Sequence, residues 1–136
     1  MEPLLDQKDI TVFIVDDDAS VRRALKRLIK VTGFKAKTFG SAQEFIDSRY
    51  YQSNGVLVLD VRMPGMSGLE LQKYLTDSGS DIPIIFITAH DDIQERNTAL
   101  EAGAIDFLKK PFGDQTLLDA FQQALNGYPS RNNESK

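Results

Sequence analysis

The stretch VFIVDD at residues 12–17 sets two carboxylates directly after four apolar side chains. The same pattern, an apolar run that ends in a polar residue, recurs in VLVLD at residues 56–60 and in IIFIT at residues 84–88. Runs without polar alternation are typical of strands that are covered on both faces, as in a parallel sheet. Helical periodicity between the runs then predicts an α/β fold, an open doubly wound parallel sheet with right-handed crossovers.

Capping residues and glycines mark where the predicted helices begin and end. Apolar residues recur at the helical period from Val21 to Ile29, and a glycine follows. A serine three residues before a glutamate fits the capping box, in which each side chain bonds to the other residue's backbone amide. The predicted boundaries are Gly33, Ser41 with Glu44, Ser67 with Glu70, Asp91-Asp92, Gly103 and Asp114. Weaker strands at residues 35–38 and 105–108 complete an expected set of five strands and five helices.

The composition fits one compact domain. A chain of 136 residues that is 41% hydrophobic can bury a proper core. Its formal net charge of -4 argues against direct nucleic-acid binding, because contacts to phosphates need clustered Lys and Arg. The lack of cysteine excludes disulfides and thiolate metal sites. We expect an N-terminal arm at residues 1–9, the main domain at 10–127, and a linker or disordered tail at 128–136.

No stretch has the pattern of a targeting or membrane segment. Residues 1–9 are acidic and lack the apolar core of a signal peptide. The longest apolar runs hold about four residues, whereas a membrane-spanning helix needs about 20. We therefore expect a cytoplasmic protein with no membrane contact.

The polar residues that end the apolar runs are candidates for one site. The carboxyl ends of parallel strands meet at one edge of the sheet, where such folds bind ligands. Three carboxylates packed there would repel one another and raise each other's pKa unless a cation neutralised them. Oxygen donors of this kind suit a hard divalent metal, and we expect Mg²⁺. The candidates are Asp16, Asp17, Asp60 and Thr88, with the ammonium of Lys110.

Four motifs together resemble the receiver domain of two-component response regulators, which has the CheY-like fold. The motifs are VDDD at residues 15–18, LDVRMPGMSG at 59–68, TA at 88–89 and KKPF at 109–112. The resemblance covers residues 10–126, and it implies five parallel strands in the order 2-1-3-4-5. Residues 38–45 and 55–64 look most like the FixJ-type subgroup, in which a helix-turn-helix DNA-binding domain usually follows. We therefore expect a piece of a longer transcription regulator, with a stand-alone receiver as the alternative.

The resemblance assigns a role to each candidate residue. Asp60 would accept a phosphoryl group from a sensor histidine kinase. Mg²⁺ would be held by the side chains of Asp17 and Asp60, by the backbone carbonyl of Arg62, and by Asp16 through a water. Lys110 would reach Asp60, aimed inward by a cis bond to Pro111. The protein would be a signalling module that assists its own phosphorylation and slow dephosphorylation, and not a metabolic enzyme.

The same resemblance implies a switch. Thr88 would donate its hydroxyl to the phosphoryl group, which would let Phe107 rotate inward. This would change the surface formed by the strand at 105–108 and the helices on either side of it, and would favour a homodimer. The helix between Asp91 and Gly103 has few expected apolar anchors, namely Ile93, Ala99, Leu100 and Ala102, which suits a segment that shifts. His90 and the side chain of Arg62 would lie at the rim of the site.

Other interpretations of these residues stay open. Asp18 fits a helix N-cap better than a metal ligand, and Phe107 could be an ordinary core aromatic. A phosphatase that forms an aspartyl phosphate would be expected to carry a second Asp where Arg62 stands. A flavodoxin-like carrier would need a hydroxyl-rich loop after the first strand, and here that loop is acidic. A pseudo-receiver used only for protein contacts would not need the complete acceptor set.

Overall fold

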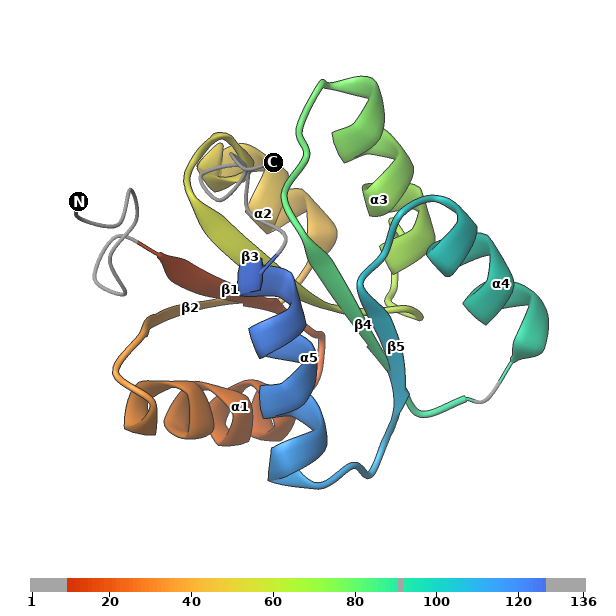
Figure 1. Cartoon of the computed structure of the whole chain (residues 1–136). Helices are drawn as coiled ribbons and strands as arrows, with labels where there is room; N and C mark the ends of the chain where they lie inside the picture. The colour runs from red at the N-terminus through yellow and green to blue at the C-terminus, as the bar shows by residue number, and fades with distance from the viewer. Residues whose placement is uncertain (1–9, 91, 127–136) are drawn as a thin grey trace, which may run out of the picture.

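The computed structural model describes residues 10–90 and 92–126, so the expected arm, the expected tail and Asp91 lie outside the described residues. Five parallel strands form one sheet in the order β2-β1-β3-β4-β5, which confirms the predicted fold class and strand order (Figure 1). The strands are β1 (Thr11–Val15), β2 (Lys35–Phe39), β3 (Gly55–Asp60), β4 (Ile84–Thr88) and β5 (Asp106–Lys109).

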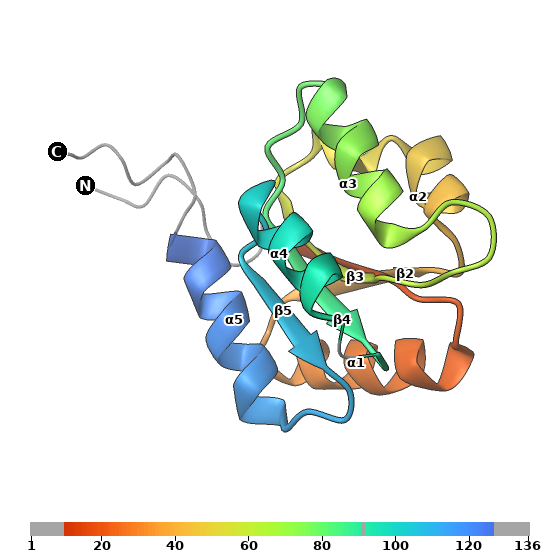
Figure 2. The ribbon, with the colours of Figure 1, turned by 90° about the vertical axis from the view of Figure 1, so that its right-hand side faces the viewer.

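Five α-helices cover the two faces of the sheet. They are α1 (Ala19–Val31), α2 (Ala42–Ser48), α3 (Gly68–Asp77), α4 (Ile93–Glu101) and α5 (Asp114–Asn126). Helices α1 and α5 pack on one face, and α2, α3 and α4 lie on the other (Figures 1 and 2). A short 3-10 helix, η2 (Tyr50–Gln52), follows α2 and was not predicted. None of the helices among the described residues is long and apolar enough to cross a membrane.

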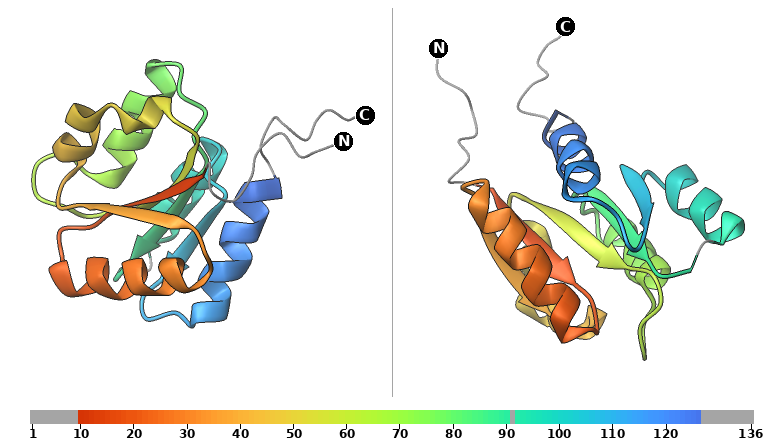
Figure 3. Two further views of the ribbon diagram at one scale, coloured as in Figure 1. Left: turned by 90° about the vertical axis from the view of Figure 1, so that its left-hand side faces the viewer. Right: turned by 90° about the horizontal axis from the view of Figure 1, so that it is seen from below.

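The three apolar runs form the middle of the sheet. Alternate residues of β1, β3 and β4 point into two separate cores, one on each face. Every residue of β3 and β4 is buried, as expected for strands covered on both sides. In contrast, β2 at the edge of the sheet has no buried residue. The two layers of helices around the twisted sheet can be followed in both views of Figure 3.

The predicted caps are mostly confirmed. Asp18 is the N-cap of α1 and accepts bonds from the backbone amides of Ser20 and Val21. Ser67 and Glu70 form a complete capping box at the start of α3. At α2 the prediction was half wrong, because Ser41 accepts the amide of Glu44 while the Glu44 carboxylate takes the amide of Gly40 instead.

Helix α1 carries a concentration of positive charge. Its residues include Arg22, Arg23, Lys26, Arg27 and Lys30, and it contains no acidic residue. Apart from the half-buried Arg22, these side chains are exposed. The chain as a whole has a formal net charge of -4, so α1 differs in charge from the rest of the chain.

Helix α4 is anchored even less than the sequence predicted. Of the expected anchors only Ala99 is buried. Ile93 is 65% exposed and Leu100 is 37% exposed, and Ala102 follows the helix as an exposed cap residue. The expectation that these three residues anchor α4 was wrong, because the short helix turns only one small side chain toward the core.

Candidate functional site

The sheet register brings the carboxylates together. Val15 of β1 pairs with Leu59 of β3, so the residues that follow them, Asp16 and Asp60, lie side by side. One oxygen from each of Asp16, Asp17 and Asp60 lies within 4.8 Å of the others. Asp16 is fully buried and Asp60 is 6% exposed, whereas Asp17 is exposed. The edge of the sheet therefore concentrates negative charge in a partly buried place.

Lys110 provides the nearest positive charge. Its backbone amide bonds to the Thr88 carbonyl at 2.6 Å, which fixes it beside the end of β4, and its peptide bond to Pro111 is cis. The Nζ atom lies 2.8 Å from Asp16 Oδ2 and 3.7 Å from Asp60 Oδ1. The sequence suggested Asp60 as the partner, but the ammonium sits closer to Asp16. Asp16 has no solvent contact, so its charge gains most from a direct partner.

Asp16 is tied into the fold by several bonds. Its Oδ1 accepts the amide of Asp18 at 2.9 Å, while Oδ2 faces Lys110. Its backbone carbonyl accepts a bond of 2.7 Å from the Arg22 guanidinium, a contact that the sequence did not indicate. Asp16 thus positions the loop after β1 as well as adding charge to the site.

Asp60 has a strongly perturbed acidity. Its pKa is raised to about 7, mainly because the carboxyl is buried and next because Asp16 carries like charge. The Lys110 ammonium opposes this shift, and Asp17 adds to it. Asp60 therefore needs further positive charge to be fully ionised in a neutral solution.

This donor set fits a hard divalent cation. The group consists only of carboxylate oxygens close enough to share one ion, and Mg²⁺ and Ca²⁺ prefer oxygen ligands. A cation placed among them would also relieve the like-charge repulsion that raises the pKa of Asp60. The predicted ligands Asp16, Asp17 and Asp60 therefore form one plausible metal centre, with the Arg62 carbonyl two residues after Asp60.

The start of α3 supports Asp60 from behind. The amide of Gly68 bonds to the Val61 carbonyl at 2.8 Å, and a β-carbon at Gly68 would collide with the Asp60 carbonyl. Gly68 is needed for this close approach, whereas Gly65 has a positive φ of 78° in the loop before it. The loop after β3 is thereby held against the strand that carries Asp60.

Thr88 and Phe107 lie where the sequence placed them, but their contacts add detail. The Thr88 hydroxyl is buried and pairs with the backbone of His90, accepting the amide at 3.0 Å and donating to the carbonyl at 3.1 Å. Phe107 is 2% exposed and packs on Phe86, with the Arg96 guanidinium 5.9 Å from its ring centre. An inward rotation of Phe107 would require an outward starting position, and here the ring already lies inside.

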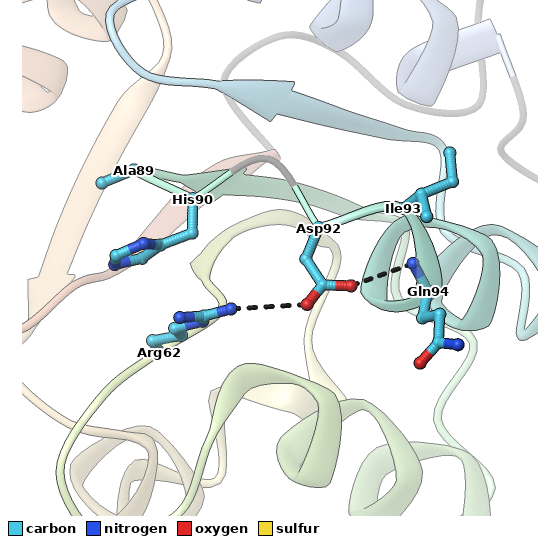
Figure 4. Close-up of a pocket in the computed structure, with 6 residues that line it drawn as sticks. All are labelled: Arg62, Ala89, His90, Asp92, Ile93 and Gln94. Atoms are coloured by element: carbon cyan, nitrogen blue, oxygen red, sulfur yellow. Dashed lines mark hydrogen bonds and ion pairs between the residues drawn. The ribbon is translucent and has the colours of Figure 1, made fainter.

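An open pocket lies between the loop after β3 and the start of α4 (Figure 4). The predicted rim residues Arg62 and His90 both line it, and both are exposed. The Arg62 guanidinium makes ion pairs with Asp92 at 3.5 Å and with Glu95 at 3.4 Å. Sequence reasoning missed these partners, since nothing in the sequence links Arg62 to residues some thirty positions later. The other lining residues are Ala89, Asp92, Ile93 and Gln94.

Comparison with known proteins gives a consistent result. The family profile described as response regulator receiver domain matches residues 12–122. The response regulator protein TmoT of Ectopseudomonas mendocina is 43% identical over 127 residues, which cover 93% of this chain and 58% of TmoT. The transcriptional regulatory protein FixJ of Rhizobium meliloti (strain 1021) is 44% identical over 116 residues, which cover 85% of this chain and 57% of FixJ.

A solved structure supports the same relationship. The crystal structure of FixJ-N superposes with a TM-score of 0.82 at 42% identity, covering 89% of this chain and 97% of that chain. The chain spans about half the length of the curated relatives that it matches.

Proposed function

Because this chain belongs to the response regulator receiver domain family, a family of signalling domains, we propose that it accepts a phosphoryl group on Asp60. The observation that carries this proposal is the meeting of Asp16, Asp17 and Asp60 with the Lys110 ammonium at one edge of the sheet. Phosphoryl transfer needs mainly positioning and charge neutralisation, and this arrangement offers both.

In the proposed reaction the donor is a phosphohistidine of a sensor kinase. An oxygen of the Asp60 carboxylate attacks the phosphorus, the P–N bond breaks, and the imidazole leaves with the bonding electron pair. Lys110 holds the cluster together before transfer and can then pair with a phosphoryl oxygen. Asp16, Asp17, Asp60 and the Arg62 carbonyl would hold Mg²⁺, with Asp16 acting through a water. When bound, the cation would neutralise charge on the carboxylates and on the phosphoryl group.

The proposed output is a change at the surface formed by α4, β5 and α5. A phosphoryl group on Asp60 would offer the Thr88 hydroxyl a stronger acceptor than the His90 carbonyl. Thr88 would then give up its bonds to the His90 backbone, and the start of α4 would shift as a result. The weak apolar anchoring of α4 supports this motion, because only Ala99 of that helix is buried. Phe107 would respond from its buried position rather than from solvent.

The wider role follows from the relatives and remains part of the proposal. Matched relatives include transcriptional regulators of which this chain covers about half. We propose that the chain controls an attached DNA-binding domain, that a sensor kinase is its partner, that phosphorylation favours a homodimer, and that it works in the cytoplasm. The alternative is a receiver that acts alone through protein contacts. A phosphatase is disfavoured because Arg62 stands where the acid would be needed.

The test is chemical phosphorylation with acetyl phosphate and Mg²⁺, followed by intact-mass measurement. We expect one added phosphoryl group, which is lost when hydroxylamine cleaves the acyl phosphate. Asp60→Asn and omission of Mg²⁺ should each abolish the adduct. Asp18→Asn is the matched control, because it also removes one carboxylate, in the loop after β1, but keeps the N-cap of α1. An unmodified wild type, or an adduct that survives in Asp60→Asn, would overturn the proposal.

A further inference from the structure

The side chain of Arg62 connects the loop after β3, which follows the proposed acceptor Asp60, to the first turn of α4. Its Nη2 atom lies 3.5 Å from Asp92 Oδ2 and 3.4 Å from Glu95 Oε1. The other oxygen of Asp92 caps α4 by accepting the amides of Gln94 at 2.9 Å and Glu95 at 3.1 Å. The Arg62–Asp92 pair and the cap are both drawn in Figure 4. One guanidinium therefore holds two acidic residues at the start of α4, Asp92 and Glu95.

We propose that Arg62 is a positioning residue which, through these two ion pairs, keeps the Thr88 hydroxyl bonded to the His90 backbone. We call these three residues, Arg62, Asp92 and Glu95, the Arg62 tether. Asp92 follows His90 by two positions, so chain connectivity limits where the His90 backbone can go while Asp92 is held. Because the His90 amide and carbonyl both pair with Thr88, fixing His90 also fixes the Thr88 hydroxyl.

The tether matters because the rest of α4 offers little that would fix its first turn. The only buried residue of the helix is Ala99, near its end. Gln72 bonds to the Ala99 carbonyl at 3.0 Å, and Arg96 bonds to the Phe107 carbonyl at 3.0 Å. Those contacts hold the middle and the end of α4. Beyond the cap itself, the described side chains that bind its first turn from another element belong to Arg62.

The tether should bias the equilibrium without blocking it. The three side chains are 48%, 39% and 24% exposed, and ion pairs of this kind contribute modestly because water and salt screen them. We expect its removal to shift the balance between bonded and released Thr88 by roughly two- to fivefold. This step rests on the proposed function, since release of Thr88 is useful only if Asp60 carries a phosphoryl group.

The first variants of the test break the tether but leave Arg62 in place. Asp92→Asn keeps the N-cap, because Asn caps a helix as well as Asp does, and Glu95→Gln keeps the shape of the side chain. Lys73→Gln is the matched control, as it removes an exposed ion pair to Asp77 within α3. The first readout is hydrogen exchange of the His90 amide without phosphate, and the second is the initial rate of phosphorylation by acetyl phosphate.

In the double variant Asp92→Asn/Glu95→Gln, both rates should rise roughly two- to fivefold, and in Lys73→Gln neither should change. High salt should raise His90 exchange in the wild type and leave the double variant unaffected. A charge swap adds specificity, because Arg62→Glu should speed exchange and a second change, Glu95→Arg, should reverse part of that increase, while Asp92 stays acidic. A purely structural role would not predict this rescue.

Wild-type exchange at His90 in the double variant would overturn the inference, and so would faster exchange that the charge swap fails to reverse. If the exchange results hold while no form of the protein accepts phosphate, the proposed function fails and the role of Arg62 stands. If phosphorylation occurs at one rate in all variants, the function stands and the inference fails.

Discussion

Two neighbouring strand–helix units, β3–α3 and β4–α4, build opposite kinds of structure at the same edge of the sheet. Helix α3 buries Gly68, Leu71, Gln72 and Leu75 and begins with a complete capping box. Helix α4 buries Ala99 and exposes Ile93 and Leu100. The helix that follows the proposed acceptor is thus firmly packed, whereas the helix that follows the fully buried strand of Thr88 is held mainly by polar contacts.

This contrast shows how one fold can place the proposed phosphorylation site next to a firmly packed helix and the proposed response on a weakly packed one. Apolar burial is insensitive to a local change of charge, so Asp60 can change its charge without losing its place. Ion pairs and single hydrogen bonds are sensitive to such a change, because each contributes about 1 kcal/mol or less. A charge at Asp60 would therefore act first on α4, although the first residue of α3 lies directly against the Asp60 carbonyl.

The largest effect is expected when a leucine is truncated to alanine in each of the two helices, α3 and α4. Leu71→Ala should destabilise the protein by about 3 kcal/mol, because the side chain is fully buried and leaves a cavity. Leu100→Ala should cost less than about 1 kcal/mol, because that side chain is 37% exposed. Urea denaturation of both variants measures the difference. Equal losses would mean that α4 is as firmly packed as α3.

A second test adds one methyl group behind Asp60. Gly68→Ala should cost about 2 kcal/mol, since the new β-carbon would collide with the Asp60 carbonyl and approach Phe86. The control is Gly113→Ala, where no atom would meet the added β-carbon within 4 Å. Thermal unfolding of the two variants gives the comparison. A fully stable Gly68→Ala would show that the start of α3 can move away from β3.

A third test concerns the raised pKa of Asp60 at the end of β3 and its effect on stability. The pKa of Asp60 is raised from 3.8 to about 7, so the unfolded chain loses this proton first as the pH rises. The contribution of Asp60 to stability should therefore fall between about pH 4 and pH 7 and stay low above that.

Asp60→Asn has no proton to lose at this position. It should be more stable than the wild type by about 2 kcal/mol at pH 8 and nearly equal to it at pH 4. Denaturation at both pH values measures this, and Mg²⁺ should narrow the gap at pH 8. The same difference at pH 4 and pH 8 would contradict the raised pKa.

The smallest expected effect lies at the contact between the two helices. Gln72 is buried on α3 and donates to the Ala99 carbonyl of α4 at 3.0 Å. Gln72→Leu should cost about 1 kcal/mol through the lost bond and the carbonyl left unpaired. Hydrogen exchange should rise in α4 more than in α3. Equal increases in both helices would show that they move as one unit.

Much of this architecture is readable from the sequence because its signals are local. Apolar runs predict β1, β3 and β4, and the cap at Asp18 and the box at Ser67 lie within three residues of their partners. Strand order is not local, and it came from the resemblance to receiver domains. The close meeting of Asp16 and Asp60 followed from that order together with the strand ends.

Features that depend on the direction of side chains could not be predicted from local sequence patterns. The nine residues of α4 do not reveal which side faces the sheet, so Ile93 and Leu100 were wrongly expected to be anchors. The Lys110 ammonium lies closer to Asp16 than to Asp60, and Asp16 is the more buried of the two carboxylates. This difference in burial appears only in three dimensions. Arg62 contacts Asp92 and Glu95 because the fold brings the loop after β3 next to the start of α4.

The uneven charge of the surface affects how this domain meets other molecules. Helix α1 carries five basic residues and no acidic one, in a chain whose net charge is -4. Such a helix presents a local positive potential, which an acidic partner would feel over about 8 Å at physiological salt. Diffusing partners would be rotated so that their negative surface approaches α1, which raises the rate of productive encounter. The rate of association, more than its final strength, would then depend on ionic strength.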